Sequence, residues 1–154
     1  MKQPNSPQGR VHKFKPRGEW NLSEELKVKL AAQIPRIVKK HRVIVVDRAM
    51  TEFGVRRGWV KIATITSKKD DNVDSDLYVP ILPTPKNRKT KMQLRLAHDP
   101  YGNILTYGSH LRVDRIYTVP RAILEEQPCE LLEKSYNGLK HFLKGEGAKL
   151  CYVE

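Results

Sequence analysis

The chain has only two cysteines, Cys129 and Cys151, and neither belongs to a CxxC pair. Histidines at zinc-ligand spacing are also missing, so the sequence argues against a disulfide framework and predicts no metal and no cofactor. No hydrophobic run approaches the length of about 18 residues that a membrane span needs. The segment Met1–Pro16 lacks the apolar core of a secretory signal. We therefore expect a soluble, cytoplasmic protein with no membrane partner.

What the chain has in excess is positive charge. Its formal net charge is +12, from 29 Lys or Arg against 17 Asp or Glu. Residues 1–61 hold 15 Lys or Arg against 5 Asp or Glu, whereas residues 100–154 hold 7 of each. Because charge of one sign concentrated in one part of a chain attracts polyanions, the sequence predicts a nucleic-acid partner.

The length of 154 residues and a hydrophobic content of 39% predict one globular domain. Residues 1–17 are basic and are interrupted by prolines and Gly9, without a sustained periodicity. This composition predicts a mobile arm ahead of a single domain at residues 18–154.

Two segments have the periodicity of helices. Apolar residues at steps of four predict a helix at about residues 22–33, which Pro35 would end or kink. Near the other end of the chain, a proline followed by an apolar stripe predicts a helix at about residues 129–143.

The centre of the chain has the pattern of β-strands. Arg42–Ala49 and Trp59–Ser67 are rich in β-branched residues on both faces, as in strands that are covered on both sides. Shorter strands are predicted at Leu77–Leu82, Met92–Leu96, Ile104–Tyr107 (after a turn at Asp99–Asn103) and His110–Val119. The expected fold is mainly β with helices (α+β): a small barrel at about residues 42–119 between an N-terminal and a C-terminal helix.

Arg112, Asp114 and His110 form one candidate site. Residues two apart in a strand project from the same face, so these side chains would emerge together. An arginine can stabilise negative charge on a phosphate under attack, and Asp or His can accept a proton from the attacking hydroxyl. An exposed cross-strand ion pair gives the same pattern and is more common.

Other residues have the chemistry to contact phosphate. Arg42 opens the most apolar strand after three further basic or histidine residues, although a basic residue that protects a strand edge would look the same. The remaining candidates are the hydroxyl-bearing or basic residues Thr66, Ser67, Lys39, Lys40, His41, Lys86, Arg88, Lys89 and Lys91.

Four short motifs follow one another in the chain: HRVIVV (His41–Val46), ATITS (Ala63–Ser67), LRVDRIYTV (Leu111–Val119) and a helix that starts after a proline. In this order the chain resembles the MazF/PemK/Kid family of toxin endoribonucleases from bacterial toxin–antitoxin systems, over roughly residues 40–145.

The resemblance places four residues on catalytic positions of the family. Arg42 falls on the arginine at the strand start, Thr66 on the active-site threonine, and Arg112 and Asp114 on an Arg-x-Asp pair. It implies an SH3-like small barrel, a homodimer and a small acidic antitoxin as partner. It also implies metal-independent cleavage of single-stranded RNA, in which the 2′-hydroxyl attacks the neighbouring phosphorus and leaves a 2′,3′-cyclic phosphate.

The chain departs from the family at two places. Val43 stands where the family has proline, and the predicted helix at residues 22–33 replaces a loop that supplies a catalytic histidine. The general base is therefore open among Asp114, His41, His110 and His12.

Several roles remain open besides catalysis. Trp59, Tyr101 and Tyr107 are candidates for stacking on RNA bases, although each also suits a core or a turn. A small-barrel protein that binds RNA or DNA without cutting it would share the basic residues. A relative of these toxins that acts on a protein target is a third possibility.

Overall fold

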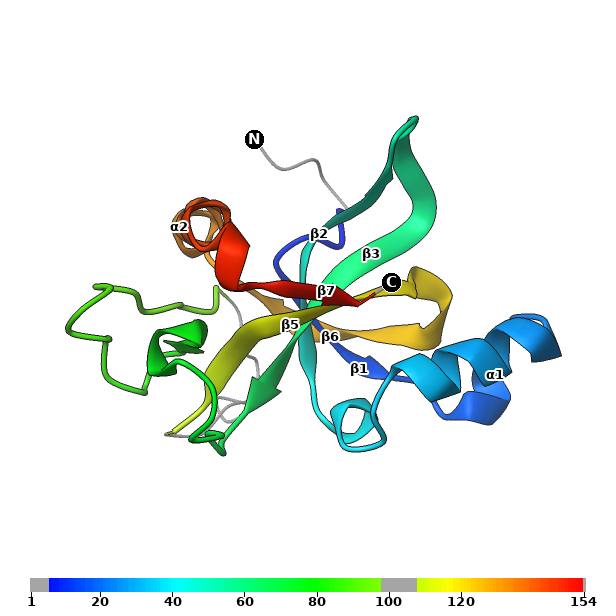
Figure 1. Cartoon of the computed structure of the whole chain (residues 1–154), viewed down its shortest axis with the longest axis horizontal. Helices are drawn as coiled ribbons and strands as arrows, with labels where there is room; N and C mark the ends of the chain where they lie inside the picture. The colour runs from blue at the N-terminus through cyan, green and yellow to red at the C-terminus, as the bar shows by residue number, and fades with distance from the viewer. Residues whose placement is uncertain (1–5, 98–107, 154) are drawn as a thin grey trace.

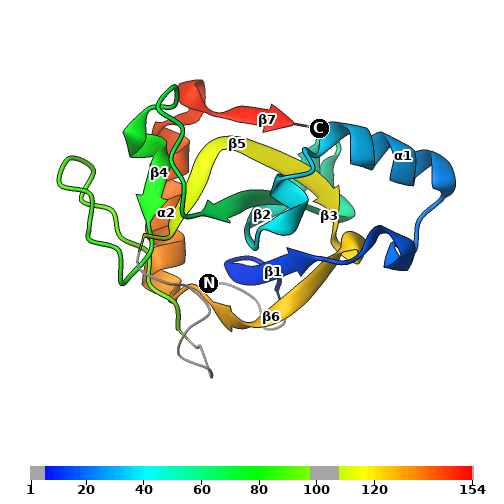
Figure 2. The same cartoon turned by 90° about the horizontal axis from the view of Figure 1, so that it is seen from below.

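The computed structural model describes residues 6–97 and 108–153. In this part of the chain a seven-stranded sheet is flanked by two α-helices, which lie at opposite ends of the molecule (Figures 1 and 2). The strands are β1 (Arg10–Phe14), β2 (Val43–Thr51), β3 (Gly54–Thr66), β4 (Tyr78–Pro80), β5 (His110–Pro120), β6 (Leu124–Glu130) and β7 (Cys151–Val153). The helices are α1 (Glu24–Gln33) and α2 (Glu133–Gly145). The expected mainly β fold with two helices is confirmed.

The sheet is antiparallel along the order β4-β5-β3-β2-β1-β6. On the side of β5 away from β3, β4 pairs with residues 110–112 and β7 runs parallel to residues 115–117. Within the described residues the sheet has two ends, β4 and β6, and is not closed. The predicted SH3-like barrel is therefore not confirmed.

Two apolar cores cover the two faces of the sheet, as β2 illustrates. Ile44 and Val46 pack in one core, whereas Val43 and Val45 pack in the other. This alternation follows from the two-residue period of a strand, and it confirms that the segment is buried on both sides. The first core includes Tyr136, Leu139 and Leu143 of α2, and the second includes Trp20, Leu30 and Ile34 around α1.

The prediction of a mobile arm at residues 1–17 is wrong for residues 10–14. These residues form β1, which pairs with β2 on one side and with β6 on the other. Val11 and His12 are fully buried there. The segment has only one aliphatic residue and follows several turn-forming residues, so its periodicity is weak, and its place in the sheet comes from backbone hydrogen bonds to distant strands.

The helix predicted at residues 22–33 is present as α1. Its start lies two residues later, where the Ser23 hydroxyl caps the helix and accepts a hydrogen bond from the Leu26 amide at 3.3 Å. The last helical residue, Gln33, precedes Pro35 by two positions, as expected.

The C-terminal helix begins later than predicted. Pro128 and Cys129 lie in β6, not in the helix, and α2 starts at Glu133 and ends at Gly145. The residue Glu130 pairs with Arg10 of β1. The partner strand β1 was missing from the sequence prediction, so the pattern of residues 124–130 gave no reason to expect a strand.

The predicted strand at residues 92–96 makes only two isolated bridges, from Leu94 to Ile81 and from Leu96 to Leu131. The predicted turn at residues 99–103 and the predicted strand at residues 104–107 lie outside the described residues. No described helix is long and apolar enough to cross a membrane.

Candidate active site

Two adjoining cavities lie where β3 and β5 approach the segment that leads into β2. The first, of about 360 Å³, is lined by Arg112 and is called the Arg112 cavity. The second, of about 410 Å³, is lined by Arg42 and is called the Arg42 cavity. His41, Thr66 and Ser67 line both cavities, so the two spaces meet at these residues.

The walls of both cavities are strongly basic. Lys68, Lys69, Arg112 and Arg115 line the first cavity, and Lys13, Lys39, Lys40 and Arg42 line the second. Among the described residues of both walls, Asp70 is the only carboxylate. Such an excess of positive charge in a concave surface favours phosphate groups.

The register of β5 places Arg112 between two strands. Arg112 is opposite Thr64 of β3 and opposite Tyr78 of β4. Its guanidinium carbon lies 5.9 Å from the centre of the Tyr78 ring. Two residues further along β3, Thr66 is opposite His110. Sheet pairing thus brings the predicted Arg112 and Thr66 close together although they are far apart in the sequence.

Asp114 fixes the orientation of Arg112. The Arg112 Nε donates to Asp114 Oδ1 at 2.6 Å, and Nη2 donates to Oδ2 at 3.0 Å. The bidentate contact with this carboxylate raises the pKa of Arg112 above its usual range. Both carboxylate oxygens hold the guanidinium, and Asp114 lines neither cavity. This geometry suits a residue that positions Arg112 better than one that accepts a proton from a substrate.

Thr66 and His41 lie at the junction of the cavities. The Thr66 hydroxyl donates to the Lys68 carbonyl and accepts from the Lys68 amide, both at 3.1 Å. These bonds hold the turn that follows β3 and keep Lys68 and Lys69 beside the Arg112 cavity. His41 ends the short helical turn Val38–Lys40 and is half-buried at the junction.

The other two histidines that were candidates for the general base line neither cavity, although His110 is the register partner of Thr66. His110 faces Tyr78 edge-on, and burial lowers its pKa. His12 is fully buried in β1, with Nδ1 3.1 Å from the Arg10 carbonyl. Burial also lowers the pKa of His12. Of the four candidates, His41 is the one that lines the cavities.

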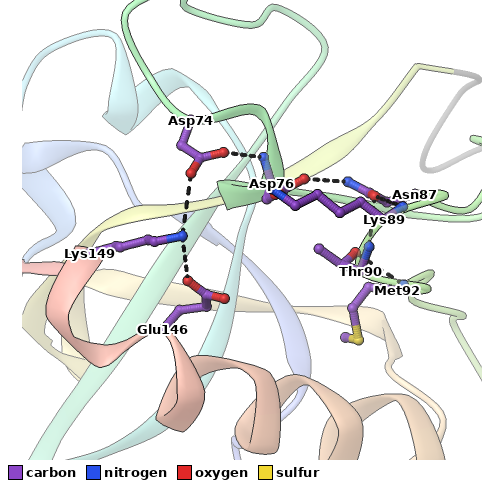
Figure 3. A network of polar contacts seen from close by, with 8 residues as sticks. All are labelled: Asp74, Asp76, Asn87, Lys89, Thr90, Met92, Glu146 and Lys149. Carbon is purple, nitrogen blue, oxygen red and sulfur yellow. Dashed lines mark hydrogen bonds and ion pairs between the residues drawn. The ribbon is translucent and has the colours of Figure 1, made fainter.

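The loop at residues 84–91 carries the remaining predicted phosphate ligands. Lys89 pairs with Asp76 at 3.0 Å, and Asn87 donates to the same carboxylate at 3.1 Å (Figure 3). The amide and the ammonium of this loop lower the pKa of Asp76, with the Lys89 contact contributing most. None of the predicted phosphate ligands Lys86, Arg88, Lys89 and Lys91 lines either cavity.

The sequence prediction missed four basic residues at the cavities: Lys13, Lys68, Lys69 and Arg115. Lys13 was assigned to the mobile arm. Lys68 and Lys69 follow Ser67 directly, so their position after the second buried strand was a usable signal. Arg115 gave no signal, because in a regular strand it would point away from Arg112 and Asp114.

Of the three residues predicted to stack on RNA bases, the structure describes one. Trp59 is half-buried and has the guanidinium of Arg56 stacked 3.5 Å from its ring centre. Tyr101 and Tyr107 lie outside the described residues. Tyr117, which was not predicted, lines the Arg112 cavity.

Comparison with known proteins finds no matching family model, curated protein or solved structure. Within the described part of the chain, no group of three or more His, Cys, Asp or Glu side chains is arranged to hold a metal ion. The interpretation of the cavities therefore depends on their own geometry and on the order of the sequence motifs.

Proposed function

We propose that this protein is an endoribonuclease that cleaves single-stranded RNA without a metal ion. The observation that carries the proposal is the placement of Arg112, held in a bidentate contact by Asp114, in a cavity that also contains His41 and Thr66. A fixed guanidinium beside a group able to accept a proton is what transesterification of a phosphodiester needs.

The reaction forms one phosphorus–oxygen bond and breaks another within the RNA. The 2′-hydroxyl loses its proton to a base, and its oxygen bonds to the adjacent phosphorus. The bond from phosphorus to the 5′-oxygen breaks, and that oxygen gains a proton. The products are a 2′,3′-cyclic phosphate and a 5′-hydroxyl, with no water consumed.

The residues divide between chemistry and binding. Arg112 stabilises the negative charge that develops on the phosphorane, and Asp114 keeps the guanidinium in place. His41 is the residue best placed to accept the proton. Thr66 holds the turn at the junction through its bonds to Lys68, and Ser67 contacts the phosphate there. The ammonium groups of the Arg42 cavity, together with Arg42, bind neighbouring phosphates.

RNA cleavage in EDTA tests the proposal directly. The purified protein should cut single-stranded RNA and leave a cyclic phosphate end, and a 2′-deoxy substitution at the cut position should abolish cleavage there. Arg112→Ala should lower the cleavage rate about 1000-fold, as removal of a preorganised charge-stabilising group does in other enzymes. Intact RNA after long incubation with the wild-type protein would contradict the proposal.

The second candidate function is RNA or DNA binding without catalysis. It is favoured by the basic walls of the two cavities, which are sufficient for phosphate binding. The same Arg112→Ala variant separates the two functions. A binding protein would lose affinity modestly and show no cleavage before or after the change, whereas a nuclease would lose rate far beyond its loss of affinity.

The biological setting that we propose is a toxin–antitoxin pair. A homodimer of the chain would be the toxin, and a small acidic antitoxin would compete with RNA for the basic cavities. Expression of the gene alone should arrest growth, and co-expression with a small acidic protein encoded beside it should relieve the arrest. If Arg112→Ala arrests growth as strongly as the wild type, the target is a protein rather than RNA.

A further inference from the structure

The ends of β2 and β3 form a hairpin, residues 48–59, that projects beyond the body of the molecule (Figure 1). Thr51 pairs with Gly54, so Glu52 and Phe53 form its two-residue turn. The Thr51 hydroxyl accepts from the Phe53 amide and donates to the Gly54 carbonyl, both at 3.2 Å. Gly54 has a φ of +116°, which favours glycine at this turn. Backbone and hydroxyl contacts thus hold Phe53 at the tip.

The tip of this hairpin is apolar. Phe53 is 91% exposed, Met50 51% and Val55 43%. A single exposed apolar side chain is ordinary, but three within six residues on a projecting turn form a small surface of the kind that binds a partner.

The flanks of the hairpin carry positive charge on the planar guanidinium groups of arginines. Arg48, Arg56 and Arg57 are exposed, against one carboxylate, that of Glu52. Arg56 is stacked on the indole ring of Trp59. Guanidinium groups bind phosphates through paired hydrogen bonds and also stack on flat rings, so these flanks complement a partner that has both phosphates and bases.

We propose that the hairpin is a second binding site for single-stranded RNA, in which a base stacks on Phe53 while Arg56 and Arg57 bind the phosphates beside it. This inference rests on the proposed function. Gly54–Thr66 spans 13 residues, so at about 3.3 Å per residue the tip lies at most roughly 40 Å from the cavities along the strand. Only a long RNA reaches both places, so the hairpin adds affinity for long substrates.

Glu52 favours RNA over a lipid surface as the partner. For Phe53 to enter a bilayer, the adjacent carboxylate in the same turn would have to approach the apolar boundary and lose its hydration. A base that stacks on Phe53 leaves that carboxylate in water. The surface therefore fits an anionic polymer with flat bases, such as single-stranded RNA.

The test compares Phe53→Ala with a matched control, Val28→Ala, which removes an exposed apolar side chain (59% exposed) from α1. Labelled oligouridines with 2′-O-methyl groups cannot undergo 2′-hydroxyl attack, so fluorescence anisotropy measures their binding alone. With oligomers of about 20 nucleotides, Phe53→Ala should bind about ten-fold more weakly than the wild type. With oligomers of about 5 nucleotides the two should bind equally, and Val28→Ala should match the wild type with both.

Two results would overturn the inference. One is equal affinity of Phe53→Ala and wild type for the long oligomer. The other is unchanged RNA affinity together with a loss of binding to vesicles of anionic phospholipid, which would assign the hairpin to a membrane.

Cleavage of unmodified RNA in EDTA, measured in parallel, keeps the two proposals separate. A wild-type protein that binds long RNA through Phe53 but cuts none supports the hairpin site and contradicts the nuclease. A protein that cuts RNA and binds it independently of Phe53 does the reverse.

Discussion

At the scale of single residues, the contact between Arg112 and Asp114 is the feature with the most consequence for function. Both nitrogens of the contact face both oxygens of one carboxylate, at 2.6 and 3.0 Å. The side chain of Asp114 is only 13% exposed, so its negative charge is satisfied mainly by this one partner. A substitution at Asp114 therefore affects function through the position of the Arg112 guanidinium.

We predict that Asp114→Asn lowers kcat for RNA cleavage about 10- to 100-fold, because hydrogen bonds to charged groups contribute about 1.5–3 kcal/mol. KM should change little, since the basic walls of the cavities remain. The measurement is steady-state cleavage with a melting curve for each variant. A large increase in KM at unchanged kcat would show that Asp114 acts in binding instead.

The burial of His12 predicts that the stability of the protein depends on pH. Burial lowers its pKa below the ordinary value, so the unfolded chain binds the proton more tightly than the folded one. The contribution of neutral His12 to stability is complete above the unfolded pKa and is lost as the pH falls through and below it. Urea unfolding should show a decreasing free energy of unfolding from about pH 7.5 to about pH 5.

The variant His12→Leu should flatten this pH dependence, because it removes the titrating group from a site where Nε2 has no hydrogen-bond partner among the described residues. His141, which is exposed on α2, provides the matched control through His141→Leu. Equal pH dependence of His12→Leu and the wild type would show that acid unfolding comes from other groups.

At the scale of secondary-structure elements, β1 joins β2 to β6 and buries Val11 completely. A chain that begins at Pro16 would lose this strand and leave two strand edges unpaired. We predict that it shows no cooperative unfolding, because the lost pairing and burial are comparable with a total stability of about 5–15 kcal/mol. A chain that begins at Ser6 should melt like the full chain, as measured by circular dichroism. If the chain from Pro16 folds normally, β1 is dispensable.

The helices and strands also differ in how well the sequence predicted them. Strands β2 and β3 were recognisable from their runs of β-branched residues, and helix α1 from apolar residues at steps of four. The strands β1 and β6 were missed because each is defined by the other as a partner: their registers join Arg10 to Glu130 and His12 to Glu126. Pairing between segments more than 100 residues apart leaves little trace in either segment alone.

At the scale of the whole molecule, the structure shows where the excess positive charge lies. The excess in residues 1–61 is not confined to a mobile arm, because Lys13, Lys39, Lys40 and Arg42 line one cavity. The basic loop at residues 84–91, which looked equally suited to RNA from its composition, is tied instead to Asp76.

This division predicts different salt dependences. Joint substitution of Lys39 and Lys40 by alanine should reduce the slope of log affinity against log salt by about 1.4, because each phosphate contact on a single strand contributes about 0.7. Joint substitution of Lys86 and Arg88 by alanine should leave the slope unchanged. Anisotropy titrations with the uncleavable oligouridine at several salt concentrations measure both. A reduced slope for the second variant would place that loop on the RNA.

The sequence by itself determined the chemistry that is present: a basic chain, two strands buried on both faces, an Arg-x-Asp pair on one side of a strand, and few groups able to hold a metal. These properties depend on residue type and on short-range periodicity, which every segment carries on its own. The tertiary structure decided which of these groups meet. It brought Thr66 and Arg112 near each other along the pairing of β3 with β5, where their register partners are His110 and Thr64, and it placed His41 on the wall of the same cavity. It left His12, His110 and the basic side chains of the 84–91 loop out of both cavity linings. Convergence of this kind depends on contacts between distant segments, and no single segment specifies those contacts.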